Sequence, residues 1–336
     1  MSVAPSAISI EQSARLTMTA VVQDRYGTAA VLETRTIPQP QAGDGQVIVR
    51  IRAAGVGPAD WAVMSGLPYI ARPVYGMRKP KHAVRGTDVA GTVEAVGPGV
   101  TRFQVGDEVF GSADGSYADF AMAAEDELAP KPANLTFEQA AASPMAGLVA
   151  QQALRGLTAG QRVLINGAGG GVGTFAVQIA KARGADVTGV CSTGSIDLVR
   201  SLGADHVIDY TRDDFTLGGE RYDLILDNVS NHSLSDLRRA LTPTGTLVPN
   251  GGGFDNRWLA SGARLARGKV MFRFGSQRMV NFLVSMKSEH LLALSALIGA
   301  GKVTPVIDRV YPLSQAAQAL ASVGEGHARG KTVITV

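Results

Sequence analysis

One stretch constrains this chain more than any other, and it reads R-V-L-I-N-G-A-G-G-G-V-G-T-F-A-V-Q-I-A-K-A-R-G from Arg162 to Gly184. Its first part, Val163 to Ile165, is a short run of branched apolar side chains, which predicts a buried strand. Its last part carries apolar residues at helical spacing and ends at Gly184, which predicts a helix. Strand, glycine turn and helix in this order are typical of a dinucleotide site, because glycine lets the backbone approach a diphosphate and the helix N-terminus supplies N–H groups. The predicted contacts to that diphosphate are Gly169, Gly170, Gly171, Val172 and Gly173.

The end of the next predicted strand, Asp186 to Ser192, bears on which dinucleotide binds. NAD requires a carboxylate there for its ribose 2′-hydroxyl, but no acid follows the strand until Asp197. A carboxylate would also repel the 2′-phosphate of NADPH, whereas hydroxyl groups can donate to it. We therefore expect NADPH as the cofactor. A 2′-phosphate favours a basic residue at position 195, where this chain has Ser195, and Arg212 could supply that positive charge instead. The predicted hydroxyl donors to the 2′-phosphate are Ser192, Thr193 and Tyr210.

Length and composition indicate a soluble protein of two domains. The chain has 336 residues, more than one ordinary core holds, and 45% of them are hydrophobic and 18% charged. The net charge of +3 is too small and too dispersed to argue for a nucleic-acid partner, and no apolar run is long enough to span a membrane. The expected partner is a small-molecule substrate.

Cysteine usage and the first residues bear on the compartment. The single cysteine, Cys191, excludes an intramolecular disulfide and fits a reducing compartment, so we expect a cytoplasmic protein. Residues 1–17 lack the apolar core of a secretory signal and are expected to form a disordered tail.

Two kinds of pattern divide the chain. Up to about residue 140, alternating apolar segments such as Gln46 to Ala54 are punctuated by glycines, which predicts a β-rich, barrel-like domain. From Phe137 the pattern becomes helical, and after the glycine turn strands alternate with helices as far as Pro249. That alternation predicts a parallel, doubly wound sheet and therefore an α/β fold class. A last strand, Thr332 to Val336, is expected to return to the first domain.

The stretch from Asn256 to Ser288 carries several Lys and Arg residues, interleaved apolar residues and no acid. A basic amphipathic helix could bind a membrane surface or an acidic partner. The alternative, which we favour, is a helical excursion that covers the cleft or makes a subunit contact.

Further motifs accompany the glycine turn. They are G-P-A-D-W at 57–61, R-G-T-D-V-A-G-T-V-E-A-V-G at 85–97, G-D-E-V-F-G at 106–111, G-S-Y-A-D-F at 115–120, S-L-G-A-D-H-V-I-D-Y at 201–210, G-K-V-T-P-V-I-D at 301–308 and R-G-K-T-V-I-T-V at 329–336. In number, order and spacing they resemble the medium-chain dehydrogenase/reductase superfamily, from Met18 to the C-terminus. The resemblance is greatest to its zinc-free branch of NADPH:quinone reductases and enone reductases.

The resemblance implies a GroES-like β-barrel catalytic domain interrupted by a Rossmann nucleotide-binding domain, with the active site between them. It places the catalytic domain at residues 18–140 and 290–336 and the Rossmann domain at residues 141–289. It also implies NADPH-dependent hydride transfer to a quinone or an α,β-unsaturated carbonyl compound, usually in a homodimer. The further cofactor contacts that it implies are Val229 beneath the nicotinamide, Gly251 and Gly252 at its carboxamide, and Lys331 from the C-terminal segment.

A metal ion is not expected. The one cysteine lies in the nucleotide-binding part, and a single histidine, His82, precedes the glycine turn. A zinc site built from one histidine and carboxylates would be unusual. In the resemblance, Gly57 and Thr87 stand near the positions where zinc-dependent relatives place Cys and His.

Reduction of the substrate also needs a proton, from solvent or from a positioned acid. The candidates near the cleft are Asp60, Tyr69, Tyr75, His82 and Arg85, from which we select Asp60, Tyr69 and His82 as catalytic. Each has a structural alternative, because Asp60 can cap the helix that follows it, Tyr69 can line the pocket and His82 can lie on the surface.

Two positions depart from the zinc-free relatives, which usually carry Asn at Gly57 and often carry Thr at Val149. Both changes remove a polar group near the nicotinamide, so the pocket is either unusually apolar or receives its polarity from the substrate. Two other functions stay open: a pathway-specific reductase of one biosynthetic intermediate, and a non-catalytic NADPH-binding sensor or partner-binding protein.

Overall fold

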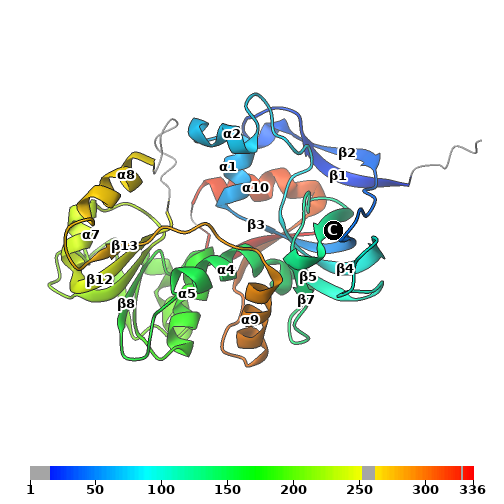
Figure 1. Ribbon diagram of the computed structural model, residues 1–336. Coiled ribbons are helices and arrows are strands. Elements are labelled where there is room, and N and C mark those ends of the chain that lie inside the picture. Colours follow the sequence, from blue (N-terminus) through cyan, green and yellow to red (C-terminus); the bar gives the residue numbers. More distant parts are fainter. Residues whose placement is uncertain (1–15, 252–261, 327) are drawn as a thin grey trace, which may run out of the picture.

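Two large β-sheets, one mainly antiparallel and one parallel, form the frame of the molecule (Figure 1). The structure is a computed structural model, and it describes residues 16–251, 262–326 and 328–336. Only the last two residues of the predicted disordered tail, residues 1–17, lie within these ranges. Thr17 already belongs to the first strand.

The first sheet contains seven strands in the order β14-β15-β3-β4-β5-β7, with β6 also paired to β3. Its central strand, β3, places Val47, Val49 and Ile51 in the core while Arg50 between them is exposed, as its alternating sequence predicts. The last strand pairs with β3 in antiparallel fashion, so the expected return of the chain is confirmed. The strands are β3 (Gln46–Val56), β4 (Asp88–Val96), β5 (Glu108–Ser112), β6 (Phe120–Ala124), β7 (Leu128–Pro130), β14 (Ile307–Pro312) and β15 (Lys331–Thr335), beside a hairpin of β1 (Thr17–Gln23) and β2 (Leu32–Pro38).

The second sheet has six strands, all parallel, in the order β10-β9-β8-β11-β12-β13. The strand order reverses between β8 and β11, and in sheets of this kind a ligand binds outside the carboxyl ends of the strands at that reversal. The strands are β8 (Arg162–Asn166), β9 (Asp186–Cys191), β10 (His206–Asp209), β11 (Tyr222–Asp227), β12 (Leu241–Pro249) and β13 (Arg278–Met279). The two sheets confirm the α/β class, with a GroES-like part and a Rossmann part.

Helices connect the strands and join the two sheets. They are α1 (Pro58–Ser65), α2 (Arg72–Tyr75), α3 (Phe137–Ala141), α4 (Pro144–Ala153), α5 (Gly171–Ala182), α6 (Ile196–Ser201), α7 (Leu234–Ala240), α8 (Gly262–Met271), α9 (Ser288–Gly299) and α10 (Ala316–Gly324). One continuous apolar core includes Ala90 of the first sheet, Leu148 of α4, Ile165 of the second sheet and Leu294 of α9. Because this core crosses from one sheet to the other, it fixes their relative position.

The described part of the basic stretch contains a helix, as expected, and also a strand, which was not expected. Residues 256–261 lie outside the described residues, α8 follows, and β13 then adds a sixth strand to the parallel sheet. An extended segment crosses from β13 to α9 (Figure 1). Gln152 of α4 holds it by two hydrogen bonds to the backbone of Ser285, at 2.9 and 3.0 Å.

Gln178 connects α5 to the chain that returns to the first sheet. Its amide donates to the carbonyl oxygen of Thr304 at 3.0 Å and accepts from the N–H of Thr304 at 2.8 Å. The Gln178 side chain is only 8% exposed, whereas Thr304 is an exposed residue. The two hydrogen bonds therefore join a buried side chain of α5 to the surface of the returning chain.

We predict that Gln178→Ala lowers the free energy of unfolding by about 2 kcal/mol, because both backbone groups of Thr304 lose their partner. Chemical denaturation followed by circular dichroism measures the change. The control is Gln39→Ala, which removes a surface hydrogen bond to Thr17 and is expected to change stability by less than about 0.5 kcal/mol. Equal effects of the two variants would contradict the prediction.

Candidate functional site

The glycine turn after β8 is packed so tightly that side chains are excluded from it. A Cβ atom on Gly173 would lie 2.1 Å from the carbonyl oxygen of Gly167, and Gly167 itself has φ +81°. A Cβ on Gly169 would lie 2.9 Å from Ser195 Cβ. The turn ends at the N-terminus of α5, whose first N–H groups have no partner within the helix. These residues fit a diphosphate group, as the sequence predicts.

The C-terminal segment runs directly past this turn. The N–H of Gly330 donates to the carbonyl oxygen of Gly169 at 2.9 Å, and Gly330 forms a bridge with Gly170. The next side chain, Lys331, crosses α5 at its first residue, since a Cβ on Gly171 would lie 3.0 Å from Lys331 Cδ. Lys331 therefore lies beside the glycine turn, and its contact with Gly171 is made by the aliphatic stem.

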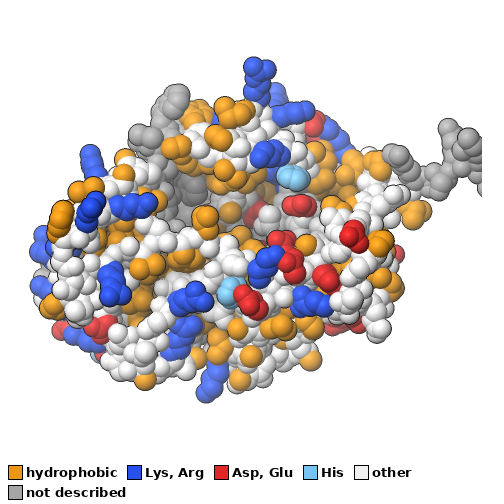
Figure 2. All heavy atoms as spheres, viewed as in Figure 1, with side chains coloured by type: hydrophobic (Ala, Val, Ile, Leu, Met, Phe, Trp, Pro, Cys, Tyr) orange, Lys and Arg blue, Asp and Glu red, His pale blue; other side chains and the backbone are white. Residues whose placement is uncertain are grey.

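The ammonium of Lys331 lies in a buried group of charges between the two sheets. Lys331 Nζ is 3.5 Å from Asp88 Oδ2, and the two side chains are only 7% and 4% exposed. The other carboxylate oxygen of Asp88 accepts the N–H of Met145 at 3.2 Å. Burial raises the pKa of Asp88, and the nearby Lys331 ammonium opposes this rise. Figure 2 shows a hollow in this face of the molecule, between the region of α1 and α2 and that of α4.

Asp60 borders the same group of charges from the first turn of α1. Its Oδ2 accepts the N–H of Gly57 at 2.9 Å, so the capping role considered as an alternative is present. Burial, reinforced by the negative charge of Asp88, raises the pKa of Asp60 to about 6. The Gly57 N–H, the charge of Lys331 and a hydrogen bond with Tyr117 act in the opposite direction. Asp60 can therefore exchange a proton near neutral pH.

The other two catalytic candidates lie in different surroundings. Tyr69 begins a short 3-10 turn, and the guanidinium of Arg72 stacks on its ring at 4.5 Å. His82 lies in an exposed loop, where its carbonyl oxygen accepts a hydrogen bond from Arg85. The guanidinium of Arg85 is itself buried, which lowers its pKa. Of the three candidates, Asp60 interacts electrostatically with both Asp88 and Lys331.

We expected only hydroxyl groups at the end of β9, but the structure also places a carboxylate there, that of Asp209. Thr193 donates its hydroxyl proton to Asp209 Oδ2 at 2.6 Å, and Thr211 donates to the other oxygen at 2.8 Å. These bonds, that of Thr193 first, hold the pKa of Asp209 below its usual value. The proton of Thr193 is therefore already engaged. Asp209 escaped the sequence analysis because it ends the neighbouring strand, β10, rather than β9.

The remaining predicted donors at this end are accessible. Ser192 is half-buried directly after β9, and the side chain of Tyr210, just after β10, is 53% exposed.

Sequence reasoning also missed a cation at this end of the site. Arg329 donates from Nη1 to the carbonyl oxygen of Gly194 at 3.0 Å. Its side chain is exposed, so the remaining guanidinium donors face solvent. No basic residue stands at Ser195 in the sequence, but Arg329 from the C-terminal segment lies beside the preceding residue, Gly194.

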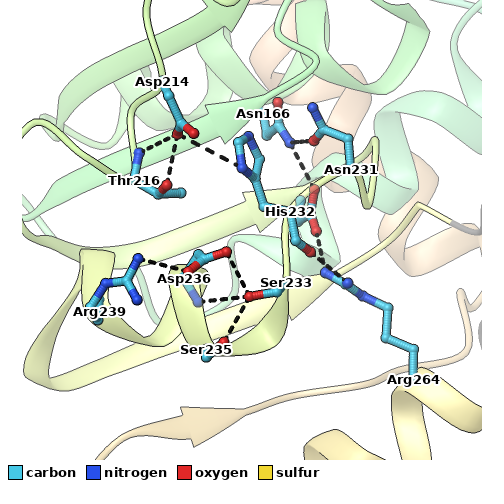
Figure 3. Close-up of polar contacts among 11 residues, drawn as sticks. Asn166, Asp214, Thr216, Asn231, His232, Ser233, Ser235, Asp236, Arg239 and Arg264 are labelled. Atoms are coloured by element: carbon cyan, nitrogen blue, oxygen red, sulfur yellow. Dashed lines mark hydrogen bonds and ion pairs between the residues drawn. The ribbon is translucent and has the colours of Figure 1, made fainter.

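The loop after β11 is held by a network of buried polar groups (Figure 3). Asp227, fully buried at the end of β11, accepts from Asn166 Nδ2 at 2.9 Å and pairs with Arg264 of α8 at 3.2 Å. It also accepts the N–H of Ser230 at 2.9 Å, and Ser230 has φ +64°. Between these two residues, Val229 stands 45% exposed at the switch point. The network therefore holds in place the loop on which Val229 is exposed.

The structure places Val229 beside the glycine turn and ties Gly251 to the same loop. A Cβ on Gly167 would lie 2.9 Å from Val229 Cγ2, so Val229 touches the glycine turn. The hydroxyl of Ser230 donates to the carbonyl oxygen of Gly251 at 2.6 Å, which ties this loop to the end of β12. Gly252, the remaining predicted contact, lies outside the described residues.

Within residues 16–251, 262–326 and 328–336, no group of three or more His, Cys, Asp or Glu side chains is placed to hold a metal ion. In the same ranges no helix has the length and apolar character needed to cross a bilayer.

Comparison with known proteins adds independent findings. The alcohol dehydrogenase GroES-like domain matches residues 43–133, and the family described as zinc-binding dehydrogenase matches residues 202–334. A mitochondrial NAD(P)H oxidoreductase, RTN4IP1 of Mus musculus, is 36% identical over 96% of this chain and 91% of its own length. The chloroplast envelope quinone oxidoreductase homolog of Arabidopsis thaliana is 33% identical over 92% of this chain and 95% of its own length.

Among solved structures, the quinone oxidoreductase from Coxiella burnetii superposes with a TM-score of 0.83. It is 29% identical in sequence, and the match covers 96% of this chain and all of that one. The glycine turn, the returning C-terminal strand and these relatives agree. The chain belongs to the medium-chain dehydrogenase/reductase superfamily, in its quinone oxidoreductase-like branch.

Proposed function

We propose that this protein is a zinc-independent, NADPH-dependent reductase that transfers hydride to a quinone or an α,β-unsaturated carbonyl compound. One observation carries the proposal: a glycine turn shaped for a diphosphate lies directly beside a buried pair of Lys331 and Asp88 and the titratable Asp60. Relatives named quinone oxidoreductases and NAD(P)H oxidoreductases support the reaction class.

Residues of this chain would hold both the diphosphate and the nicotinamide ring of the cofactor. The N–H groups at the start of α5 face the diphosphate. Val229, beside Gly167, supports the nicotinamide ring. When bound, NADPH supplies a hydride, that is, both electrons of the reduction.

We favour NADPH over NADH because of Arg329. Asp209 is ionised and by itself would repel a 2′-phosphate or accept from a 2′-hydroxyl, which favours NADH. Thr193 and Thr211 already donate three hydrogen bonds to this carboxylate, however, two from their hydroxyls and one from the N–H of Thr211. A guanidinium with free donors beside Gly194 is a better match for a phosphate than for a neutral hydroxyl.

The proposed independence of zinc follows from the charge that already occupies the site. A Cβ on Gly57 would lie 3.4 Å from Lys331 Nζ. A metal ion near this position would be repelled by the ammonium at close range. Thr87 offers a hydroxyl rather than an imidazole at the neighbouring position.

Asp60 is the proposed source of the proton. Its raised pKa leaves part of the population protonated near neutral pH, as a general acid requires. Tyr69 and His82 stay weaker candidates because Arg72 stacks on the first and the second lies in an exposed loop.

A homodimer and a cytoplasmic location complete the proposal. β13 is the edge of the parallel sheet, and near it Phe274 and Leu283 are 74% and 96% exposed. An exposed sheet edge with large apolar side chains suits an interface with a second copy. The thiol of Cys191 is free and buried, which suits a reducing compartment.

We predict that the protein oxidises NADPH when a panel of quinones and enones is offered, measured by the loss of NADPH absorbance. Duroquinone and 2-cyclohexen-1-one represent the two substrate classes. Turnover of a single crowded substrate would favour a pathway-specific reductase, and NADPH binding without any turnover would contradict the proposed function.

We predict that Arg329→Ala weakens NADPH binding about tenfold or more and leaves NADH binding unchanged, because it removes a charge-assisted contact to the 2′-phosphate. Nicotinamide fluorescence in a titration measures both affinities. Arg212→Ala tests the basic residue that the sequence alone suggested, and both affinities should stay within about twofold of the parent. A loss of equal size for both cofactors in Arg329→Ala would show that the arginine acts elsewhere.

We predict that turnover at saturating NADPH falls by up to tenfold per pH unit above about 6, because the protonated fraction of Asp60 falls. Asp60→Asn should be about 100-fold slower at pH 6 and should lack this decline. The amide oxygen of Asn can still accept the Gly57 N–H, so the helix cap is kept. An Asn variant with the parent pH profile would remove Asp60 from the reaction.

A further inference from the structure

Gly57 leaves a small polar opening at the junction of β3 and α1. A Cβ built on Gly57 would have two neighbours within 4 Å among the described residues beyond the adjoining backbone: Lys331 Nζ at 3.4 Å and Asp60 Oδ2 at 3.9 Å. The backbone of Gly57 has φ −145°, which other residues adopt readily. Backbone geometry therefore does not require glycine here. Its absent side chain leaves room beside an ammonium and a carboxyl group.

The ammonium that faces this opening is held in place. The backbone N–H of Lys331 donates to the carbonyl oxygen of Val306 at 2.9 Å, and the stem is packed over Gly171. Lys331 Nζ is 3.5 Å from Asp88 Oδ2, longer than an optimal charge-assisted hydrogen bond. An ammonium has three N–H donors. The carboxylate thus keeps the charge in position while donors are left to face a ligand.

The position of the charge argues against a diphosphate contact as the role of Lys331. The atom above the first residue of α5 is Cδ of the stem, whereas Nζ reaches past it to Gly57. The glycine turn and the helix N-terminus already offer N–H groups to a diphosphate. The charge lies on the side of the first sheet, where Asp60 also lies.

We propose that Lys331 is a catalytic residue whose ammonium holds the carbonyl oxygen of the substrate in the opening beside Gly57. The inference rests on the proposed function. Hydride addition to an enone or a quinone moves the carbonyl π electrons onto oxygen, which becomes negative. The ammonium of Lys331 donates a hydrogen bond to that oxygen and keeps its own proton. The hydride comes from NADPH, which leaves as NADP⁺, and the proton that completes the product comes from Asp60 or water.

This assignment explains how the site can lack both a metal ion and a polar side chain at residue 57. A fixed donor that meets the developing charge is the usual means of stabilising an oxyanion, and it is most effective where water is excluded. Lys331 is 6% exposed, so its field is little screened by solvent.

The experiment compares Lys331→Met with the double variant Asp88→Asn/Lys331→Met. The double variant removes both buried charges together and so avoids an unpaired carboxylate. We expect kcat for duroquinone and 2-cyclohexen-1-one to fall about 100-fold or more in both variants, as for the loss of an oxyanion donor. NADPH affinity, measured by fluorescence, should stay within about threefold of the parent. The surface control Lys302→Met should match the parent in both measurements.

A binding measurement tests the same charge without turnover. With NADP⁺ bound, 4-nitrophenol should bind to the parent protein as its coloured phenolate, because an anionic oxygen beside Lys331 is stabilised. The double variant should lose this phenolate signal and bind the probe at least tenfold more weakly. Adding Gly57→Asn to the double variant places an amide N–H in the opening and should restore about tenfold in kcat.

Three results overturn the inference: an unchanged kcat in the double variant, a loss of kcat matched by an equal loss of NADPH affinity, or phenolate binding that does not depend on Lys331. If the parent protein binds NADPH but reduces no quinone or enone, the proposed function fails. The phenolate measurement still decides in that case whether Lys331 holds an anionic oxygen.

Discussion

The hydrogen bond from the N–H of Gly330 to Gly169 is the contact on which the rest of the site depends. It fastens the last strand of the first sheet to the glycine turn of the second, so the two halves of the site cannot be positioned independently. Glycine is required at residue 330, since its φ is +102° and a Cβ there would lie 2.5 Å from the carbonyl oxygen of Val306. Without this close approach neither Arg329 nor Lys331 would reach the cofactor cradle.

The buried pair of Lys331 and Asp88 is better explained by chemistry than by stability. Removing each ion from water costs several kcal/mol, and an ion pair at 3.5 Å recovers only part of that. Asp60 adds a second acid nearby whose pKa is raised to about 6, which shows that the surroundings already disfavour negative charge. Apolar residues of similar volume would make an equally stable or more stable core. In the proposed reduction, a fixed positive charge at this place is useful because the carbonyl oxygen of the substrate becomes negative.

What could be predicted from the sequence was local. The glycine turn, α5 and the alternation of strands and helices follow from patterns within a few residues, and so does the cap formed by Asp60 on α1. The missed features all depend on segments that meet only after folding. β13 is two residues long and is defined by its pairing with β12. Asp209 reaches Thr193 from the next strand, and Arg329 reaches Gly194 from the end of the chain.

In the proposed function, cofactor choice and catalysis both depend on one tripeptide. Arg329, Gly330 and Lys331 follow one another, and each contacts a different part of the cradle: Gly194 after β9, Gly169 in the turn and Gly171 at the start of α5. A shift of this segment by even one residue would move the guanidinium from the adenosine end and the ammonium from Gly57 at the same time. The register of β15 against β3 therefore bears on function as well as on fold. That register is held by backbone pairs such as Thr332 with Val56, which directly adjoin Lys331 and Gly57.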